Sequence, residues 1–167
     1  MPEIINNYLS PSNFAISISR IPNVEFFTQK ITIPSISATP VTIDTPLAAI
    51  YMEQDKIQYD DLTLTFIVDE NMNNYKEILN WMEGIASPES TKQRALIDAG
   101  KDGVTSDIIL TVTNSHKNPN LRFKFTNCFP TNLGQIDLDI NVQDVAYATC
   151  SVTMRYDTMQ MEQYNGA

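Results

Sequence analysis

The side chains that could do chemistry in this sequence are few and lie far apart. His116, the single histidine, sits in the run Ser-His-Lys-Asn-Pro, which is typical of a solvated loop. Cys128 and Cys150 lack Cys-x-x-Cys spacing and have no histidine nearby, so they do not make a zinc motif. We expect two free thiols in a reducing compartment, with a structural disulfide as the alternative.

Carboxylate pairs are the second candidate for chemistry. Asp60–Asp61 and Asp69–Glu70 are neighbours in an expected strand, so the members of each pair face opposite sides. Asp137 and Asp139 share a face, but two carboxylates on an exposed strand are ordinary solvated surface. The sequence also lacks a Gly-rich phosphate loop, a Gly-x-Ser-x-Gly motif and a calcium-binding loop. We therefore expect no catalytic residue, no metal and no cofactor.

Length and composition favour one folded unit. The chain has 167 residues, of which 43% are hydrophobic and 19% are charged, as in ordinary globular domains. We expect a single domain over residues 1–167, with a loose N-terminal arm (about 1–11) and a loose C-terminal tail (about 157–167). No apolar run reaches the ~20 residues of a membrane span, and Met1–Ser10 lacks the features of a signal peptide.

The acidity of the chain argues against a protein that binds nucleic acid tightly. Its 11 basic and 20 acidic residues give a net charge of −9, whereas DNA binding needs Lys and Arg to replace counterions. The charge is explained by solubility, or by a surface that stays close to DNA without binding it.

Alternating apolar and polar residues predict several antiparallel strands and one helix. The helix is expected over Asn73–Ala86, with a buried stripe and with Trp81 either in the core or as an exposed anchor. A change of parity at Asp60–Asp61 predicts a β-bulge. The resulting fold class is an all-β, mainly antiparallel sandwich or incomplete barrel with one flanking α-helix. The expected strands are Phe14–Ser19, Phe27–Ile33, Ile57–Glu70, Ile108–Thr113, Leu121–Thr126, Gln135–Gln143 and Ala146–Tyr156. The expected helical stripe is Tyr75, Ile78, Leu79, Met82 and Ile85.

A long connection precedes the third of these strands. Val41–Lys56 has an apolar middle, Leu47–Met52, that is too short for a helix of its own. Long connections in compact domains tend to be functional. This segment folds either onto its own domain or onto a neighbouring copy.

The run Phe129–Asp139 predicts a tight turn that leads into a strand with one apolar and one acidic face. Pro130 fixes φ, Asn132 tolerates left-handed geometry, and Gly134 accepts a positive φ. With Thr131 they form the expected structural turn. Ile136, Leu138, Ile140 and Val142 alternate with Asp137, Asp139, Asn141 and Gln143 in the strand that follows.

This Phe-Pro-Thr-Asn-Leu-Gly block resembles the tail tube proteins of contractile-tailed bacteriophages. The resemblance extends in order along most of the chain, from the proline-bearing stretch Ile33–Ser37 through Tyr59–Glu70 and Asn80–Met82 to the closing strand Thr149–Asp157. The chain is also similar to the tube proteins of type VI secretion and of phage-like contractile injection systems.

The resemblance implies a structural subunit whose hexameric rings stack head to tail into a hollow tube. The tube would lie inside a contractile sheath and conduct DNA from head to host. The implied partners are other copies of the chain, the tail sheath protein, a tape-measure protein in the lumen, the baseplate tube initiator, the tail terminator and passing double-stranded DNA. The implied location is the tail of the virion, assembled in the host cytoplasm.

Residue roles follow from combining the resemblance with the pattern. The apolar connection would form a subunit interface, and the acidic strand would line the channel or else face the sheath side. The interface residues are Leu47, Ala48, Ile50, Tyr51 and Met52, and the channel residues are Asp137, Asp139 and Asn141. The alternatives are a tube subunit of a protein-injection machine, a baseplate tube-initiator paralogue, and a monomeric β-sandwich that binds a small partner.

Overall fold

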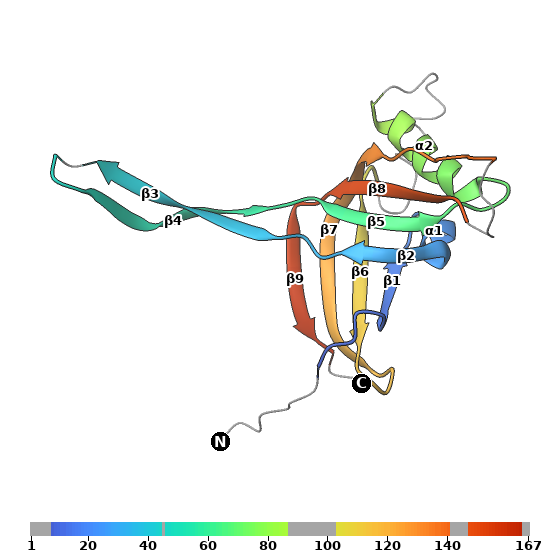
Figure 1. The fold of residues 1–167 in the computed structure, drawn as a ribbon, viewed down its shortest axis with the longest axis horizontal. Helices are drawn as coiled ribbons and strands as arrows, with labels where there is room; N and C mark the ends of the chain where they lie inside the picture. Colours follow the sequence, from blue (N-terminus) through green and yellow to red (C-terminus); the bar gives the residue numbers. More distant parts are fainter. Residues whose placement is uncertain (1–7, 45, 87–102, 141–146, 165–167) are drawn as a thin grey trace.

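A computed structural model of the protein describes residues 8–44, 46–86, 103–140 and 147–164 (Figure 1). Most of this part is antiparallel β structure, which confirms the predicted fold class. In chain order the elements are β1 (Phe14–Ile18), α1 (Pro22–Phe27), β2 (Thr28–Thr32), β3 (Ile36–Asp44), β4 (Ala49–Tyr59), β5 (Leu62–Ile67), α2 (Asn73–Ala86), β6 (Ser106–Thr113), β7 (Pro119–Leu133), β8 (Thr149–Arg155) and β9 (Thr158–Gln163).

One bent sheet forms the body of the molecule. Its strand order is β1-β6-β7-β8-β5-β2, and β9 also pairs with β7. The long strand β7 joins the two halves, because its first part pairs with β6 and β9 and its last part pairs with β8. In Figure 1 the strands β1, β6, β7 and β9 run roughly across β2, β5 and β8. The sheet does not close, so the fold is an incomplete barrel.

The core fills the space between the two halves of the sheet. Alternate residues of β5, β6 and β8 are buried, as the apolar alternation of the sequence predicts. Phe66 and Phe125 are the largest fully buried side chains. They are joined by other fully buried apolar residues, among them Ile18, Leu62, Leu64, Ile108, Val152 and Met154.

Helix α2 has the bounds that the sequence predicts, but its buried face is rotated from the expected stripe. Ile78 and Trp81 are buried, whereas Leu79 is exposed. Trp81 therefore belongs to the core, and its indole N–H donates to the carbonyl oxygen of Val104 at 2.9 Å. The rotation arises because buried Asn74 faces inward and its amide donates to the carbonyl oxygen of Ile67 at 2.7 Å.

Helix α1 was not predicted, and it takes the first residue of an expected strand. Phe27, which the sequence pattern places in a strand, is the last residue of this six-residue helix, and β2 begins at Thr28. Pro22 occupies the start of the helix, where its missing N–H costs nothing, and Val24 is buried.

The predicted long strand Ile57–Glu70 is wrong as a single element. Strand β4 ends at Tyr59 and pairs only with β3 among the described strands, whereas β5 begins at Leu62 in the main sheet. Asp60 and Asp61 therefore connect two sheets, and the change of parity marks this crossing and not a bulge. The Asp60 N–H donates to the carbonyl oxygen of Ser35 at 3.1 Å.

The predicted turn at Phe129–Gly134 is also wrong. Strand β7 continues through Pro130, Thr131 and Asn132 to Leu133, and neither Asn132 nor Gly134 has a positive φ. Pro130 lies opposite Met154 and Asn132 lies opposite Thr153, so Thr131 is an extra residue in a β-bulge. Proline is accepted in strands at such bulges. The residues that suggested a reversal of the chain therefore bend a strand that continues.

The acidic strand predicted over Gln135–Gln143 does not form in the described residues. Residues 134–139 have no regular structure, and Asn141 and the residues up to 146 lie outside the described part. Leu138 and Ile140 were expected to face the core, but they are 86% and 98% exposed. Leu138 and Ile140 therefore do not pack on the described core, whereas Ile136 is partly buried against it.

The C-terminal tail is not loose over most of its described length. Residues Thr158–Gln163 form β9, which pairs with β7 from Leu121↔Gln163 to Thr126↔Thr158. The expected loose tail from about residue 157 is therefore an edge strand of the main sheet over these six residues.

Candidate assembly surfaces

The predicted interface segment forms the long hairpin of β3 and β4, which projects from the body of the molecule (Figure 1). These strands contact mainly each other. The possibility that the segment folds onto its own domain is therefore wrong. Leu47 is 98% exposed and Tyr51 is 71% exposed, and Ala48, Ile50 and Met52 are exposed as well.

Register divides the hairpin into two different faces. Ile43 lies opposite Ile50 and Val41 lies opposite Met52, so these four residues share one apolar face. Each of them is between 43% and 54% exposed. The opposite face carries the pair Thr42 and Tyr51. We call Val41, Ile43, Ile50 and Met52 the apolar hairpin face.

Sequence reasoning left Val41 and Ile43 out of the predicted interface. Their apolar character is visible in the sequence, but their place beside Ile50 and Met52 depends on the strand pairing. An exposed contiguous patch of this kind marks an interaction site. The structure brings together Ile50 and Met52, and it places Tyr51 on the other side of the ribbon.

A second surface lies on the outer side of β2, β5 and β8. Lys30, Thr65 and Ser151 form one cross-strand row, and Thr32, Thr63, Thr153 and Asn132 form the next. The opposite side of these strands carries the buried residues Leu64, Phe66 and Val152. We call Lys30, Thr32, Thr63, Thr65, Ser151 and Thr153 the hydroxyl face. It presents mostly neutral groups that bind water.

The predicted channel residues Asp137 and Asp139 are exposed and lie beyond the end of β7. Asp137 accepts a hydrogen bond from the Gln135 amide at 3.3 Å. The third predicted channel residue, Asn141, lies outside the described residues. Gly134 anchors the start of this segment, since its N–H donates to the carbonyl oxygen of Ser151 at 2.7 Å.

The side chains that could take part in chemistry either stabilise the fold or are exposed to solvent. Cys128 and Cys150 are free thiols, as the sequence favoured. Both are also buried, and burial raises the pKa of Cys128 to about 12. The Asp61 carboxylate accepts from the Arg155 guanidinium at 2.6 Å. His116 is exposed in the loop between β6 and β7. Among the residues that the structure describes, no group of three or more His, Cys, Asp or Glu side chains is placed to hold a metal ion.

Sequence reasoning also missed Asn127 as a structural residue. It has φ of 55°, lies at the register shift between the Ser106 and Ile108 pairs, and donates to Asp157 at 2.7 Å. Asn is enriched at positive φ, but the Thr-Asn-Cys sequence around it gives no other sign of a bulge.

No helix of the described part has the length and apolarity to cross a membrane.

Comparisons with known proteins agree on one family. A family model described as "Phage tail tube protein" matches residues 2–162. The tail tube protein of Serratia phage KSP90 is 26% identical over 99 residues, which cover 59% of this chain and about half (53%) of that relative.

Solved structures share the fold at low sequence identity. A chain from the extended sheath-tube complex of an extracellular contractile injection system, PVC, has a TM-score of 0.63 at 16% identity and covers 96% of this chain and 95% of that one. A chain from the tube-terminating cap of the anti-feeding prophage has a TM-score of 0.64 at 14% identity, with 98% and 97% covered. A type six secretion system protein has a TM-score of 0.50 at 8% identity, with 89% and 82% covered.

Proposed function

This chain belongs to the phage tail tube protein family, and from that premise we propose that it is the subunit of a hollow tube made of hexameric rings stacked head to tail. The role is structural and not catalytic. The tube is part of the virion tail, is assembled in the host cytoplasm and conducts double-stranded DNA during ejection.

The apolar hairpin face is the observation that carries this proposal. A projecting two-stranded ribbon with little contact to its own body is marginal in water unless it packs on something. In a tube, Val41, Ile43, Ile50 and Met52 bury against an adjacent copy, and Leu47 at the tip of the hairpin extends the contact. A hairpin that reaches past its own body is suited to tie one copy to the next.

The hydroxyl face supplies the channel wall in this proposal. Its Thr and Ser side chains hold water and present no row of cations that would retain phosphates by counterion release. Asp137 and Asp139 add negative charge to this wall. A neutral to acidic wall lets a duplex slide, whereas a basic wall holds it.

Further partners follow from the same proposal. The outer surface of the tube meets the tail sheath protein, the ends meet the baseplate tube initiator and the tail terminator, and the lumen first holds a tape-measure protein. The DNA contact is not sequence-specific. A tube subunit of a protein-injection machine and a baseplate tube initiator are alternatives that differ in cargo or in position along the tube.

Sedimentation velocity and negative-stain microscopy of the purified chain test the proposal. Rings or tubes are expected as the protein concentration rises. A monomer that persists up to the solubility limit would contradict the proposal and favour the monomeric β-sandwich. Nuclease-protected DNA in particles that contain the chain would separate a phage tail from a protein-injection machine.

A further inference from the structure

The main sheet is open along one side, and the opening is apolar. Strands β1 and β2 are the two ends of the strand order, and a cavity of about 470 Å³ lies between them. Its apolar lining includes Leu9, Pro11, Phe14, Ile31, Leu110 and Val112. We call this cavity and its two flanking strands the seam.

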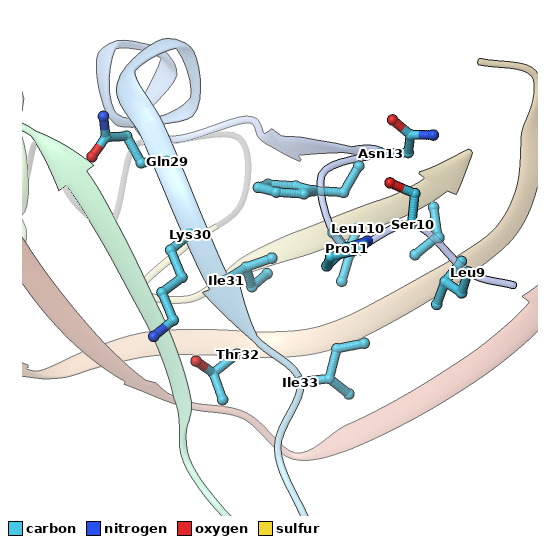
Figure 2. Close-up of a pocket in the computed structure, with 12 residues that line it drawn as sticks. Leu9, Ser10, Pro11, Asn13, Gln29, Lys30, Ile31, Thr32, Ile33 and Leu110 are labelled. Carbon is cyan, nitrogen blue, oxygen red and sulfur yellow. The ribbon is translucent and has the colours of Figure 1, made fainter. Parts of the chain in front are cut away.

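Side chains of β2 divide between the seam and the hydroxyl face. Figure 2 shows Ile31 and Ile33 on the side of β2 that faces Pro11 and Leu110, and Lys30 and Thr32 on the other side. Among the described strands, β1 pairs only with β6 and β2 pairs only with β5. Strand β2 therefore presents a backbone edge that no described strand pairs with, beside an apolar cavity, and such an edge accepts an added strand. At β1 the Ile18 N–H already donates to the Glu25 carboxylate at 2.7 Å.

The opposite margin of the same part of the sheet carries a segment that fits this opening. Residues Ile136–Ile140 follow Gly134, which is bonded to β8, the strand that pairs with β5 on its other side. The segment alternates apolar and acidic residues, and Leu138 and Ile140 are 86% and 98% exposed. It has five residues, as β2 does. We call Ile136–Ile140 the acidic segment.

We propose that the acidic segment of one copy pairs with the free edge of β2 in the next copy and inserts Leu138 and Ile140 into the seam. This rests on the proposed function and specifies its lateral contact. In an added strand, Asp137 and Asp139 take the opposite parity and lie beside Lys30 on the hydroxyl face. Opposite charges therefore meet where the apolar residues insert.

The position of the two surfaces determines the symmetry of the contact. The seam lies at one margin of the β8-β5-β2 half of the sheet and the acidic segment lies at the other, so the contact is head to tail. A head-to-tail contact joins unlike surfaces, and it makes a ring where its rotation closes. A second copy also covers both the apolar cavity and the exposed Leu138 and Ile140.

Photo-crosslinking identifies the neighbour of the acidic segment. A benzoylphenylalanine residue replaces Leu138 in the full chain, and mass spectrometry maps its crosslinks in assembled rings. The expected crosslinks join Leu138 to Leu9–Phe14 or Gln29–Ile33 of another copy. The same probe at Met161 on β9, which is 65% exposed, gives no crosslink to those residues. Crosslinks from position 138 to the hairpin residues 36–59, or only within one copy, would overturn the inference.

Substitutions test whether insertion of apolar side chains drives assembly. L138D together with I140D is expected to lower the fraction of protein in rings at least tenfold, while the monomer keeps its melting temperature because both residues are exposed in it. L138V with I140V retains rings. Wild-type assembly by the Asp variant would refute this inference and leave the proposed tube intact. Failure of the wild-type chain to assemble would refute both.

Discussion

Position 134 requires glycine, but for a different reason from the one that the sequence suggests. Sequence reasoning predicted that this glycine serves a turn with positive φ, but the residue is required by the close approach of β8. An added Cβ would lie 2.5 Å from the Ser151 hydroxyl oxygen and 2.9 Å from the Ser151 carbonyl oxygen. The sequence marks a position where a side chain is excluded, and only the strand pairing tells which neighbour excludes it.

We predict that Gly134→Ala destabilises the monomer by about 1–3 kcal/mol, as overpacking of a close contact does. Denaturant unfolding measures the change. Ser151→Ala in the same chain removes the hydroxyl contact and leaves the carbonyl contact, so the double variant recovers part of the loss. A glycine needed only for a turn would show no rescue from position 151.

Cys128 permits a prediction about pH. Burial raises the pKa of this thiol to about 12 from 9.0, so above pH 9 the unfolded chain loses the proton while the folded chain keeps it. Because only the unfolded chain releases this proton in that range, the free energy of unfolding falls as pH rises from 9 to 12. Urea midpoints from pH 8 to 11 are expected to fall less steeply with pH in Cys128→Ala than in wild type.

Thiol labelling gives an independent check of the same burial. Electrophilic thiol reagents are expected to leave Cys128 and Cys150 unmodified in the folded chain at pH 8 and to label both in urea, where the thiolates can attack them. Labelling of folded Cys128 at the rate of a free peptide thiol would contradict the burial.

At the scale of elements, Asn74 connects α2 to the end of β5. Its amide donates to the Ile67 carbonyl at 2.7 Å, and its oxygen accepts from the Asp69 N–H at 3.3 Å and the Tyr75 N–H at 2.9 Å. The side chain is fully buried. Asn74→Ala therefore leaves buried groups without partners and is predicted to cost about 1–3 kcal/mol.

The neighbouring residue supplies the control for this change. Asn73 is exposed and its amide donates to the Asp69 carboxylate at 3.2 Å, so Asn73→Ala is expected to change stability by less than about 0.5 kcal/mol. Thermal unfolding of the two single variants gives the comparison. If the two substitutions lowered the melting temperature equally, Asn74 would stabilise only the start of the helix and not its link to β5.

The hairpin permits a prediction about assembly that separates its two faces. Leu47→Asp with Ile50→Asp is expected to prevent tube formation while the monomer keeps its circular dichroism spectrum, because both residues are exposed in the single chain. Thr42→Asp adds charge to the other face of the ribbon and is expected to have a smaller effect. Normal tubes from the Leu47 and Ile50 variant would show that the hairpin is not an interface.

Elements with a local cause were predictable from the sequence, and elements with a distant cause were not. The bounds of α2 follow from its apolar period, and the core positions of β1 and β6 follow from alternation. Gln135–Gln143 has equally good alternation but no partner strand for its described residues within the chain. Alternation tells which residues share a face, and not whether the surface they need belongs to the same copy.

For the whole molecule, the sequence predicts a sandwich or an incomplete barrel but cannot specify which part of the sheet stays open. The seam exists because β1 and β2 end the strand order, and this order depends on pairing between residues far apart in the chain, such as Phe14 and Val112. Leu47 to Met52 are exposed in the single chain, as an interface requires, and their role as an interface stays a prediction. Sequence reasoning missed Val41, Ile43 and the lining of the seam, since these surfaces are defined only by the folded topology.

The charge of the channel wall permits a prediction for the assembled tube. In the proposed ring, Asp137 and Asp139 lie beside Lys30 on the hydroxyl face, and exposed pairs of this kind contribute at most about 1 kcal/mol. Changing both Asp residues to Lys is therefore expected to leave rings intact while it makes the wall basic. A basic wall holds phosphates by counterion release, so DNA ejection slows and the delay shrinks as salt rises. Timed DNA release from particles measures this delay.

The control variant D137N with D139N removes the negative charge without adding cations and is expected to slow ejection less. Wild-type ejection by the Lys variant would place both residues away from the lumen.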